Sequence, residues 1–403
     1  MALITSGTTA WEQELLYAAS RKAIASVVKD LWPGKDAALG ASCPSVTSYV
    51  CEVTVPGEQE LLYAKYSWLS TSLVSILRGA KGPLEEVQEA QLSYVRSADL
   101  LTRREAQHLA FLRELGRPRV CDTVGLHNGV LLTRAAKGRA IADEMAARPW
   151  DTAEILDAVL LPLTDLHGLA GAEYLRGAWP INERSIADVF LRKFNGPDAA
   201  RYTRNLGKHG LLREHERLEV VSRVENAVRR LLRLTVALPS RRTTAVFGDL
   251  KPEHVYLDGP RLTFIDPAIQ WAAGPQPDIA KLVGRTMLLA LCHPEARAER
   301  QITAGVVTTL RNCLAALPKG DRAECLRQVL VLWLMDTVSI LSTCLSAPPS
   351  LPLAHGQQPL ARHALRVATV ADRVSALLIG SMSGIGLLDA AFSEVGDRPW
   401  AAR

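Results

Sequence analysis

The sequence lacks the cysteine patterns of disulfide-bonded and zinc-binding proteins. Its seven cysteines are scattered along 403 residues, and no two of them form a C-x-x-C pair. Scattered cysteines are typical of a reducing compartment, in which they serve as small core residues. The sequence also lacks a dense run of Lys or Arg, although its formal net charge is +5. Nucleic-acid binding is therefore not expected.

The sequence has no long uncharged run that would predict a membrane span. Its longest apolar stretch, Val329 to Leu345, carries Asp336 near the middle. The stretch is short for a span, and a charge within a membrane is costly, so a buried helix is predicted. The first residues, MALITSGTTAWEQELL, lack the basic start and continuous apolar core of a signal peptide. We expect a cytoplasmic protein without a membrane partner.

Motifs of several other enzyme classes are also missing. We find no Ser/His/Asp arrangement of a hydrolase and no metalloprotease motif. His167, in LTDLHGL, is predicted to be a packed residue of an apolar helix rather than a catalytic one.

Hydrophobic periodicity predicts a sheet-containing first part and a mostly helical second part. The length suffices for one large or two medium domains. A first helix is predicted to end at Pro33-Gly34, and another, in LLTRREAQHLAFLRELG, at Gly116. Four runs predict antiparallel strands: 48–55, 60–69, 119–124 and 129–135. After them the sequence is predicted to be helical, apart from short strands around two aspartates.

Those two aspartates lie in the most informative part of the sequence. Asp249 lies in GDLKPEHVYLD, and Asp266 follows at the end of the apolar strand in LTFIDPA. A pair of carboxylates, one in a loop and one just after a strand, is suited to phosphoryl transfer. One can take a proton from an attacking hydroxyl, and the other can hold the Mg²⁺ that bridges nucleotide phosphates.

The segment GDLKPEH resembles the catalytic loop H-R-D-L-K-P-E-N of the protein-kinase superfold. The chain is most similar to the aminoglycoside (antibiotic) phosphotransferase branch of that superfold. The resemblance implies that Asp249 is the catalytic aspartate and that Lys251 faces the transferred phosphoryl group. It also implies that Asp266 is the metal-binding Asp of D-F-G.

The sequence departs from this pattern at several positions. Phe247 replaces the loop His, Pro267 and Ala268 replace Phe-Gly, and His254 replaces the second metal-binding Asn. Imidazole is a poor ligand for Mg²⁺, which prefers oxygen donors. His254 could bind the second metal weakly, form a hydrogen bond with Asp249, or do neither.

The same resemblance implies a nucleotide site in the first part of the chain. Lys65, in LLYAKYS, matches the strand lysine that holds the α- and β-phosphates, and Glu105 matches the helix glutamate that pairs with it. The carbonyl of Arg134 and the N–H of Ala136 would bind the adenine edge. Three other glutamates compete with Glu105 for the pairing role: Glu85, Glu86 and Glu89.

The predicted fold class is α+β, a two-lobe protein-kinase-like fold. Residues 1–134 would form a small nucleotide-binding lobe with an antiparallel sheet. Residues 135–403 would form a large, mostly helical catalytic and substrate-binding lobe. Asp278, in GPQPDIAKLVG, resembles the helix aspartate that anchors the catalytic loop, and it could equally cap its own helix.

The expected activity is phosphorylation of a hydroxyl by ATP or GTP with Mg²⁺. Only eleven residues separate Asp266 from Asp278, and no A-P-E motif is present. A small-molecule acceptor is therefore favoured over a protein. The alternative is a non-catalytic nucleotide-binding or scaffold protein. A monomer or a homodimer is expected.

The charge of the sequence bears on the acceptor. The chain is basic, and a predicted helical insert, Trp179 to Ser240, is rich in arginine. A neutral or weakly charged antibiotic of nucleoside or glycoside type is favoured over a polycationic aminoglycoside. The family resemblance implies a role in resistance or self-protection. The arginines of the insert include Arg192, Arg201, Arg204, Arg213, Arg217, Arg223, Arg229 and Arg230.

Overall fold

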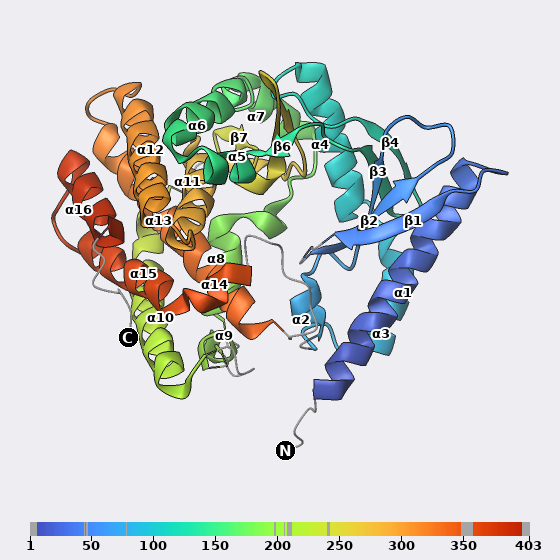
Figure 1. The fold of residues 1–403 in the computed structure, drawn as a ribbon, viewed down its shortest axis with the longest axis horizontal. Helices are drawn as coiled ribbons and strands as arrows, with labels where there is room; N and C mark the ends of the chain where they lie inside the picture. Colours follow the sequence, from blue (N-terminus) through green and yellow to red (C-terminus); the bar gives the residue numbers. More distant parts are fainter. Residues whose placement is uncertain are drawn as a thin grey trace. The chain divides into compact units, whose positions relative to one another are not determined.

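The chain divides into two structural units, shown in Figure 1. The first comprises Met1–Lys137 and Ala347–Gln358, and the second comprises Gly138–Ser346 and Pro359–Arg403. The lobe functions assigned above to residues 1–134 and 135–403 stay predictions. The computed structural model describes residues 6–43, 45, 47–77, 79–196, 199–204, 206–207, 212–239, 242–347 and 358–396.

The first unit is built on an antiparallel five-stranded sheet with strand order β1-β2-β3-β5-β4. Helices α1 and α4 pack against the sheet. The strands are β1 (Ala38–Cys43), β2 (Ser48–Thr54), β3 (Leu62–Ser67), β4 (Thr123–His127) and β5 (Val130–Arg134). The helices are α1 (Ser6–Leu31), α2 (Leu73–Leu77), α3 (Leu84–Tyr94) and α4 (Leu101–Leu115).

Most of these elements follow directly from the sequence pattern. Side chains of β2 alternate in burial along most of the strand, as expected when one face of a sheet covers a core. Gly116 ends α4 in the left-handed conformation, with φ of 78°. The core of this unit joins α1 to the sheet and includes Leu16, Ile24, Leu62 and Leu132.

The strand predicted at residues 119–124 is displaced toward the C-terminus in the structure. β4 spans Thr123–His127 and pairs with β5 across the turn Asn128-Gly129. Both turn residues have positive φ, 46° and 81°. A two-residue turn of this kind fixes which residues pair on either side of it. The turn therefore decides the position of β4, and the apolar run at 119–124 does not.

The second unit is mostly helical, as predicted, and Figure 1 shows its helices α5 to α16. The first group of helices is α5 (Ile141–Ala147), α6 (Thr152–Leu160), α7 (Leu169–Gly177), α8 (Ile186–Phe194), α9 (Ala199–Arg204) and α10 (Glu214–Leu234). The second group is α11 (Gln276–Leu291), α12 (Ala296–Ala315), α13 (Arg322–Ser346), α14 (Gln358–Arg362), α15 (Ala364–Ile379) and α16 (Gly384–Gly396).

Short strands of the second unit surround the two aspartates of the motif. β8 pairs with β6 and β9, and β7 pairs with β10. Asp249 follows β7, and Asp266 follows β9. The α+β class predicted from the sequence is therefore confirmed. The strands are β6 (Arg139–Ala140), β7 (Thr244–Val246), β8 (Val255–Asp258), β9 (Arg261–Phe264) and β10 (Gln270–Ala272).

The apolar run that contains Asp336 forms the centre of α13. This helix is long and apolar enough to cross a membrane, but 94% of its most apolar window is buried inside the fold. It packs against α11, α15 and α8. The prediction of a buried helix is therefore confirmed, and the position of Asp336 requires buried partners for its charge.

Candidate functional site

Lys65 and Glu105 form a buried ion pair in the first unit. The Lys65 Nζ lies 2.7 Å and 2.8 Å from the two carboxylate oxygens of Glu105. β3 holds Lys65 between Val50 of β2 and Leu131 of β5, and α4 carries Glu105. Only 7% and 2% of the two side chains are exposed. The pair forms as expected, and its role toward a nucleotide stays a prediction.

Arg134 and Ala136, the residues predicted to bind the adenine edge, lie at and just beyond the end of β5. The amide of Arg134 donates to the carbonyl of Asp122 at 2.8 Å. Its guanidinium lies 3.4 Å from Glu58 and 3.6 Å from Glu60. Within the part of the chain that the structure describes, the Ala136 N–H donates to no carbonyl or side chain. It could therefore donate to a ligand.

The loop that carries Asp249 is fixed through its backbone. The amides of Phe247 and Gly248 donate to the Asp278 carboxylate at 2.7 Å and 2.8 Å. Phe247 is fully buried and packs on Phe264. At Gly248, φ is 86°, and an added Cβ would lie 2.1 Å from the Ala268 carbonyl oxygen. The loop anchoring predicted for Asp278 is confirmed.

His167 supports the same anchor. Its Nε2 lies 2.9 Å from Oδ2 of Asp278. The prediction that His167 lies on an apolar helix is wrong, because it occupies a turn before α7. Gly168 takes an extended conformation, with φ of −94° and ψ of −158°, so the chain does not continue as a helix into α7.

Three basic side chains contact the Asp249 carboxylate. Nζ of Lys251 lies 3.2 Å from Oδ2, Nη1 of Arg184 lies 3.5 Å from Oδ2, and Nζ of Lys281 lies 3.6 Å from Oδ1. Burial would raise the pKa of the Asp249 carboxyl. The neighbouring positive charges outweigh burial and hold that pKa well below its usual range. Asp249 is therefore ionised at neutral pH.

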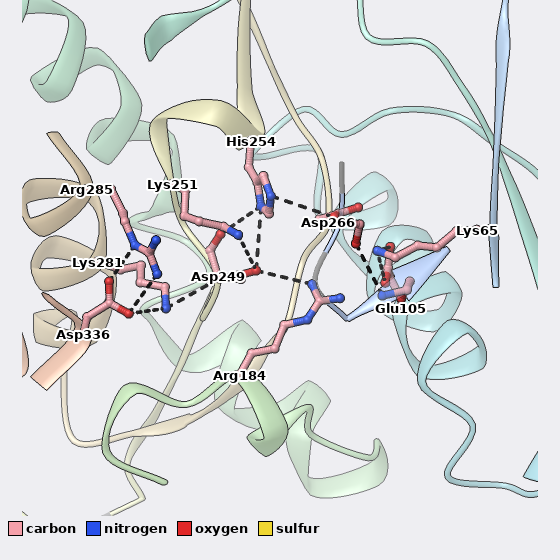
Figure 2. A network of polar contacts seen from close by, with 12 residues as sticks. Lys65, Glu105, Arg184, Asp249, Lys251, His254, Asp266, Lys281, Arg285 and Asp336 are labelled. Atoms are coloured by element: carbon pink, nitrogen blue, oxygen red, sulfur yellow. Dashed lines mark hydrogen bonds and ion pairs between the residues drawn. The ribbon is translucent and has the colours of Figure 1, made fainter. Parts of the chain in front are cut away.

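Lys281 also belongs to a second ion-pair cluster, drawn at the left of Figure 2. Lys281 and Arg285 lie one turn apart on α11, and both contact Asp336 of α13. Nζ of Lys281 lies 2.8 Å from Asp336 Oδ1, and Nε of Arg285 lies 2.6 Å from Oδ2. Burial opposes ionisation of Asp336, but the two cations outweigh it and lower its pKa to about 2.

Arg184, Lys281 and Arg285 were not predicted from the sequence. One signal was available for the last two residues. Asp336 interrupts an apolar run, so it needs a cationic partner, and a nearby helix carries Lys281 and Arg285 one turn apart. Arg184 has no such signal, because it lies in the short 3₁₀ helix Asn182–Arg184, far from Asp249 in the sequence.

Arg184 itself belongs to the insert, but several other arginines of the insert pair with acids away from Asp249. Arg217 contacts Glu214, and Arg223 contacts Glu219, each within one turn of α10. Arg230 contacts an aspartate of α15, Asp372. The side chains of Arg201 and Arg204 lie outside the described residues. The positive charge beside Asp249 therefore comes from Arg184, Lys251 and Lys281.

His254 lies between the two aspartates of the motif. Its Nδ1 is 3.1 Å from the Asp249 backbone oxygen, which can only accept a hydrogen bond. We therefore assign the ring proton to Nδ1. Nε2 then carries the lone pair, 3.9 Å from Oδ2 of Asp266. Of the roles considered for His254, the hydrogen bond to Asp249 is present, to its backbone carbonyl.

The protonation state of His254 agrees with this assignment. Burial, with the nearby positive charge of Lys251, lowers the pKa of His254 to about 3. The imidazole is therefore neutral at neutral pH. A backbone hydrogen bond also links His254 to the neighbour of Asp266. The amide of Ile265, which directly precedes Asp266, donates to the His254 carbonyl at 2.9 Å.

The chain offers two ligands for a divalent cation at this point. Among the described residues, no group of three or more His, Cys, Asp or Glu side chains is arranged to hold a metal. The neutral Nε2 of His254 and the carboxylate of Asp266 provide one nitrogen and one oxygen. A mixed pair of this kind fits Mn²⁺ better than Mg²⁺. Nucleotide phosphates and water would have to supply the remaining ligands.

No protein-family model matches the chain, and no curated protein matches its sequence. Solved structures to which it is similar include an aminoglycoside phosphotransferase with ADP and hygromycin B, at 11% identity over 86% of this chain and 97% of that chain, with a TM-score of 0.47. A choline kinase from Cryptosporidium parvum has 10% identity over 93% and 98% of the two chains and a TM-score of 0.46. An ethanolamine kinase from Plasmodium vivax has 11% identity over 86% and 85% and a TM-score of 0.46. We base the proposed function on this chain's own side chains.

Proposed function

We propose that the protein is a phosphotransferase that moves a phosphoryl group from ATP or GTP to a hydroxyl of a small molecule. The observation that carries the proposal is the environment of Asp249. Its carboxylate is buried and ionised, Asp278 anchors the backbone of its loop, and Lys251 lies 3.2 Å from the carboxylate. Phosphoryl transfer needs this kind of positioning and charge stabilisation more than covalent chemistry by the protein.

Asp249 would orient the acceptor hydroxyl and receive its proton. A carboxylate with a low pKa is a weak base, so the proton would move only when the bond to phosphorus is forming. Lys251 would stabilise the charge of the transferring phosphoryl group. His254 would hold the loop in place through the Asp249 carbonyl.

Asp266 and His254 would hold the divalent cation. When bound, the cation would neutralise the charge of the nucleotide phosphates. We expect Mn²⁺ to support a higher rate than Mg²⁺, because imidazole is a better ligand for Mn²⁺. Replacing His254 with Asn should reverse this preference, since an amide oxygen suits Mg²⁺. Complete loss of activity with both metals would show that His254 is needed chiefly to hold the loop.

The first unit would bind the nucleotide. Lys65, held in place by Glu105, would contact the α- and β-phosphates, and Arg134 and Ala136 would contact the adenine edge through their backbones. The unpaired N–H of Ala136 supports the second role. Because these contacts involve the backbone, the side chains of Arg134 and Ala136 do not indicate whether adenine or guanine is bound. The proposal therefore includes both ATP and GTP.

The acceptor would be a neutral or weakly charged antibiotic of nucleoside or glycoside type, and the role would be resistance or self-protection. The cations around Asp249 support the exclusion of polycationic aminoglycosides, which they would repel. The burial of α13 supports a protein without a membrane partner. We further propose a cytoplasmic monomer or homodimer that binds no nucleic acid.

The proposal is tested by nucleotide turnover. The full chain is incubated with ATP or GTP, Mg²⁺ or Mn²⁺, and a panel of hydroxylated antibiotics and nucleosides, and products are screened for a mass gain of one phosphate. Metal-dependent product formation that is lost in Asp249→Asn supports the assignment. Nucleotide binding without turnover, under all combinations, would instead support the non-catalytic nucleotide-binding or scaffold alternative.

A further inference from the structure

Four basic side chains surround two buried carboxylates in the region of Asp249. Asp266 lies beyond the His254 ring and is assigned to the metal. The four basic residues are Arg184, Lys251, Lys281 and Arg285. The two carboxylates are Asp249 and Asp336.

Arg285 is the member of this cluster with unused hydrogen-bonding capacity. Its Nε and Nη2 both donate to Asp336. Its Nη1 has no hydrogen-bond or ion-pair partner in the described part of the chain. Only 12% of the side chain is exposed, but Nη1 is not one of the fully buried unpaired nitrogens, so an incoming ligand could reach it. An arginine fork that is held on one side is suited to bind a carboxylate or phosphate on the other.

The pKa of Lys251 reflects the same crowding of basic groups. Burial lowers the pKa of Lys251, and the charges of Arg285 and Lys281 lower it further, although Asp249 opposes them. The basic groups are thus close enough to destabilise one another. Burying a surplus cation is costly. An anion that enters this site would remove that cost.

Lys251 and Lys281 contact different oxygens of the Asp249 carboxylate. Lys251 approaches Oδ2, and Lys281 approaches Oδ1. Lys251 is assigned to the transferring phosphoryl group. Lys281 and its neighbour Arg285 are therefore free of that task, and Lys281 lies beside the carboxylate that an acceptor hydroxyl would have to reach.

We propose that the acceptor carries one acidic group, a carboxylate or a phosphate, which Arg285 and Lys281 bind while its hydroxyl faces Asp249. The proposal rests on the phosphotransferase function proposed above and narrows its substrate class. Arg285 is then a specificity-determining residue. Asp336 is a positioning residue, because it holds Arg285 and Lys281 through the contacts shown in Figure 2.

The first test uses inorganic sulfate as a probe and does not require a known acceptor. Thermal unfolding of the full chain is followed in sodium sulfate and in sodium chloride of equal ionic strength. Sulfate at about tenfold its dissociation constant should raise the midpoint by about 2 °C. Arg285→Gln should lose this shift, and Arg297→Gln, an exposed arginine of α12, should retain it. Equal shifts in all three proteins would overturn the proposal.

Sulfate could also bind where nucleotide phosphates bind, and a further variant separates the two sources. Lys65→Met should keep the sulfate shift, because Lys65 belongs to the first unit and is not part of the cluster. If Lys65→Met abolishes the shift and Arg285→Gln does not, the sulfate reports the nucleotide site, and the proposal is overturned.

The second test compares acceptors that differ by one carboxylate, such as glucuronate with glucose and glycerate with glycerol. The acidic member of a pair should be phosphorylated more efficiently. Arg285→Gln should raise its KM by about 10–100-fold, and Arg285→Lys should restore part of the loss. Neither variant should change the KM of the nucleotide.

The outcomes of this second test separate the two proposals. Equal conversion of acidic and neutral partners would overturn the acidic acceptor and leave the phosphotransferase function standing. Absence of nucleotide turnover with every acceptor and metal would overturn the phosphotransferase function, and the acidic acceptor with it.

Discussion

The two units contain buried charges of different character. In the first unit, one ammonium and one carboxylate, Lys65 and Glu105, meet through both carboxylate oxygens and balance each other. In the second unit, Asp249 and Asp336 lie among basic side chains that exceed them in number. Both sites are nearly closed to solvent, so the difference does not come from exposure.

One site is thus a pair of opposite charges, and the other is a cluster in which basic side chains surround two carboxylates. A balanced buried pair is stable as long as both partners remain, and losing one leaves an uncompensated charge. A cluster with surplus cations is relieved by an incoming anion. We infer that Lys65–Glu105 mainly fixes the position of one ammonium, and that the Asp249 cluster is organised around a ligand.

The largest effect is expected at the centre of the second site. Asp249→Asn should lower nucleotide turnover by about a thousandfold, because an amide can neither accept the proton nor carry the charge. Circular dichroism should show an intact fold. Asp258→Asn, which alters an exposed aspartate at the end of the following strand, is the matched control and should leave turnover unchanged. Near-normal turnover in folded Asp249→Asn would refute its role.

The balanced pair is tested by removing one partner and then both. Glu105→Gln should lower the free energy of unfolding by about 3–5 kcal/mol, because the buried Lys65 ammonium loses the carboxylate charge 2.7 Å away. The double variant Lys65→Met/Glu105→Met should recover most of this loss. Urea denaturation of the full chain provides the measurement. Additive losses in the double variant would mean that the two residues do not stabilise the unit as a pair.

The pH dependence of stability should also distinguish the two regions, because His254 lies only in the second. Its folded-state pKa, about 3, is below the ordinary value of 6.5. Below pH 6.5 the unfolded chain therefore binds a proton that the folded protein excludes. The stability that depends on neutral His254 is fully present above pH 6.5, and it is lost progressively as the pH decreases toward 3.

The expected loss of unfolding free energy grows with the difference between pH 6.5 and the pH of the measurement. Between pH 7.5 and pH 5, the wild type should lose about 2 kcal/mol more than His254→Asn. Urea denaturation at both pH values provides the measurement. Glu105→Gln, which leaves His254 in place, should show the same pH dependence as the wild type. A wild-type curve identical to that of His254→Asn would mean that His254 is not held neutral.

The smallest effect is expected at an ion pair that is exposed to solvent and belongs to neither buried site. Arg311 and Asp389 contact each other at 2.8 Å, and 53% of each side chain is exposed. Arg311→Ala should change the free energy of unfolding by less than about 0.5 kcal/mol, because water screens the pair. A loss comparable to that of Glu105→Gln would show that burial is not what separates these sites.

Local sequence predicted the residues of the motif and several elements around them. Asp249, Lys251, His254 and Asp266 were predicted as one group because they occupy one short segment. In the structure the contacts of Asp249 and His254 join them. The helix that carries Glu105 was predicted from its apolar face and its terminal glycine. The position of β4 was not, because the turn that sets its register overrides the apolar pattern.

By itself, the sequence determined the order of the elements, the α+β class and the placement of two aspartates beside short strands. These properties depend on neighbours in the chain, which periodicity and turn residues record. Only the tertiary structure decided which distant charges meet Asp249. Arg184, Lys281 and Asp336 come from separate segments, and a long-range ion pair leaves no spacing in the sequence. The tertiary structure also set the state of His254, because burial and the charges around it lower its pKa.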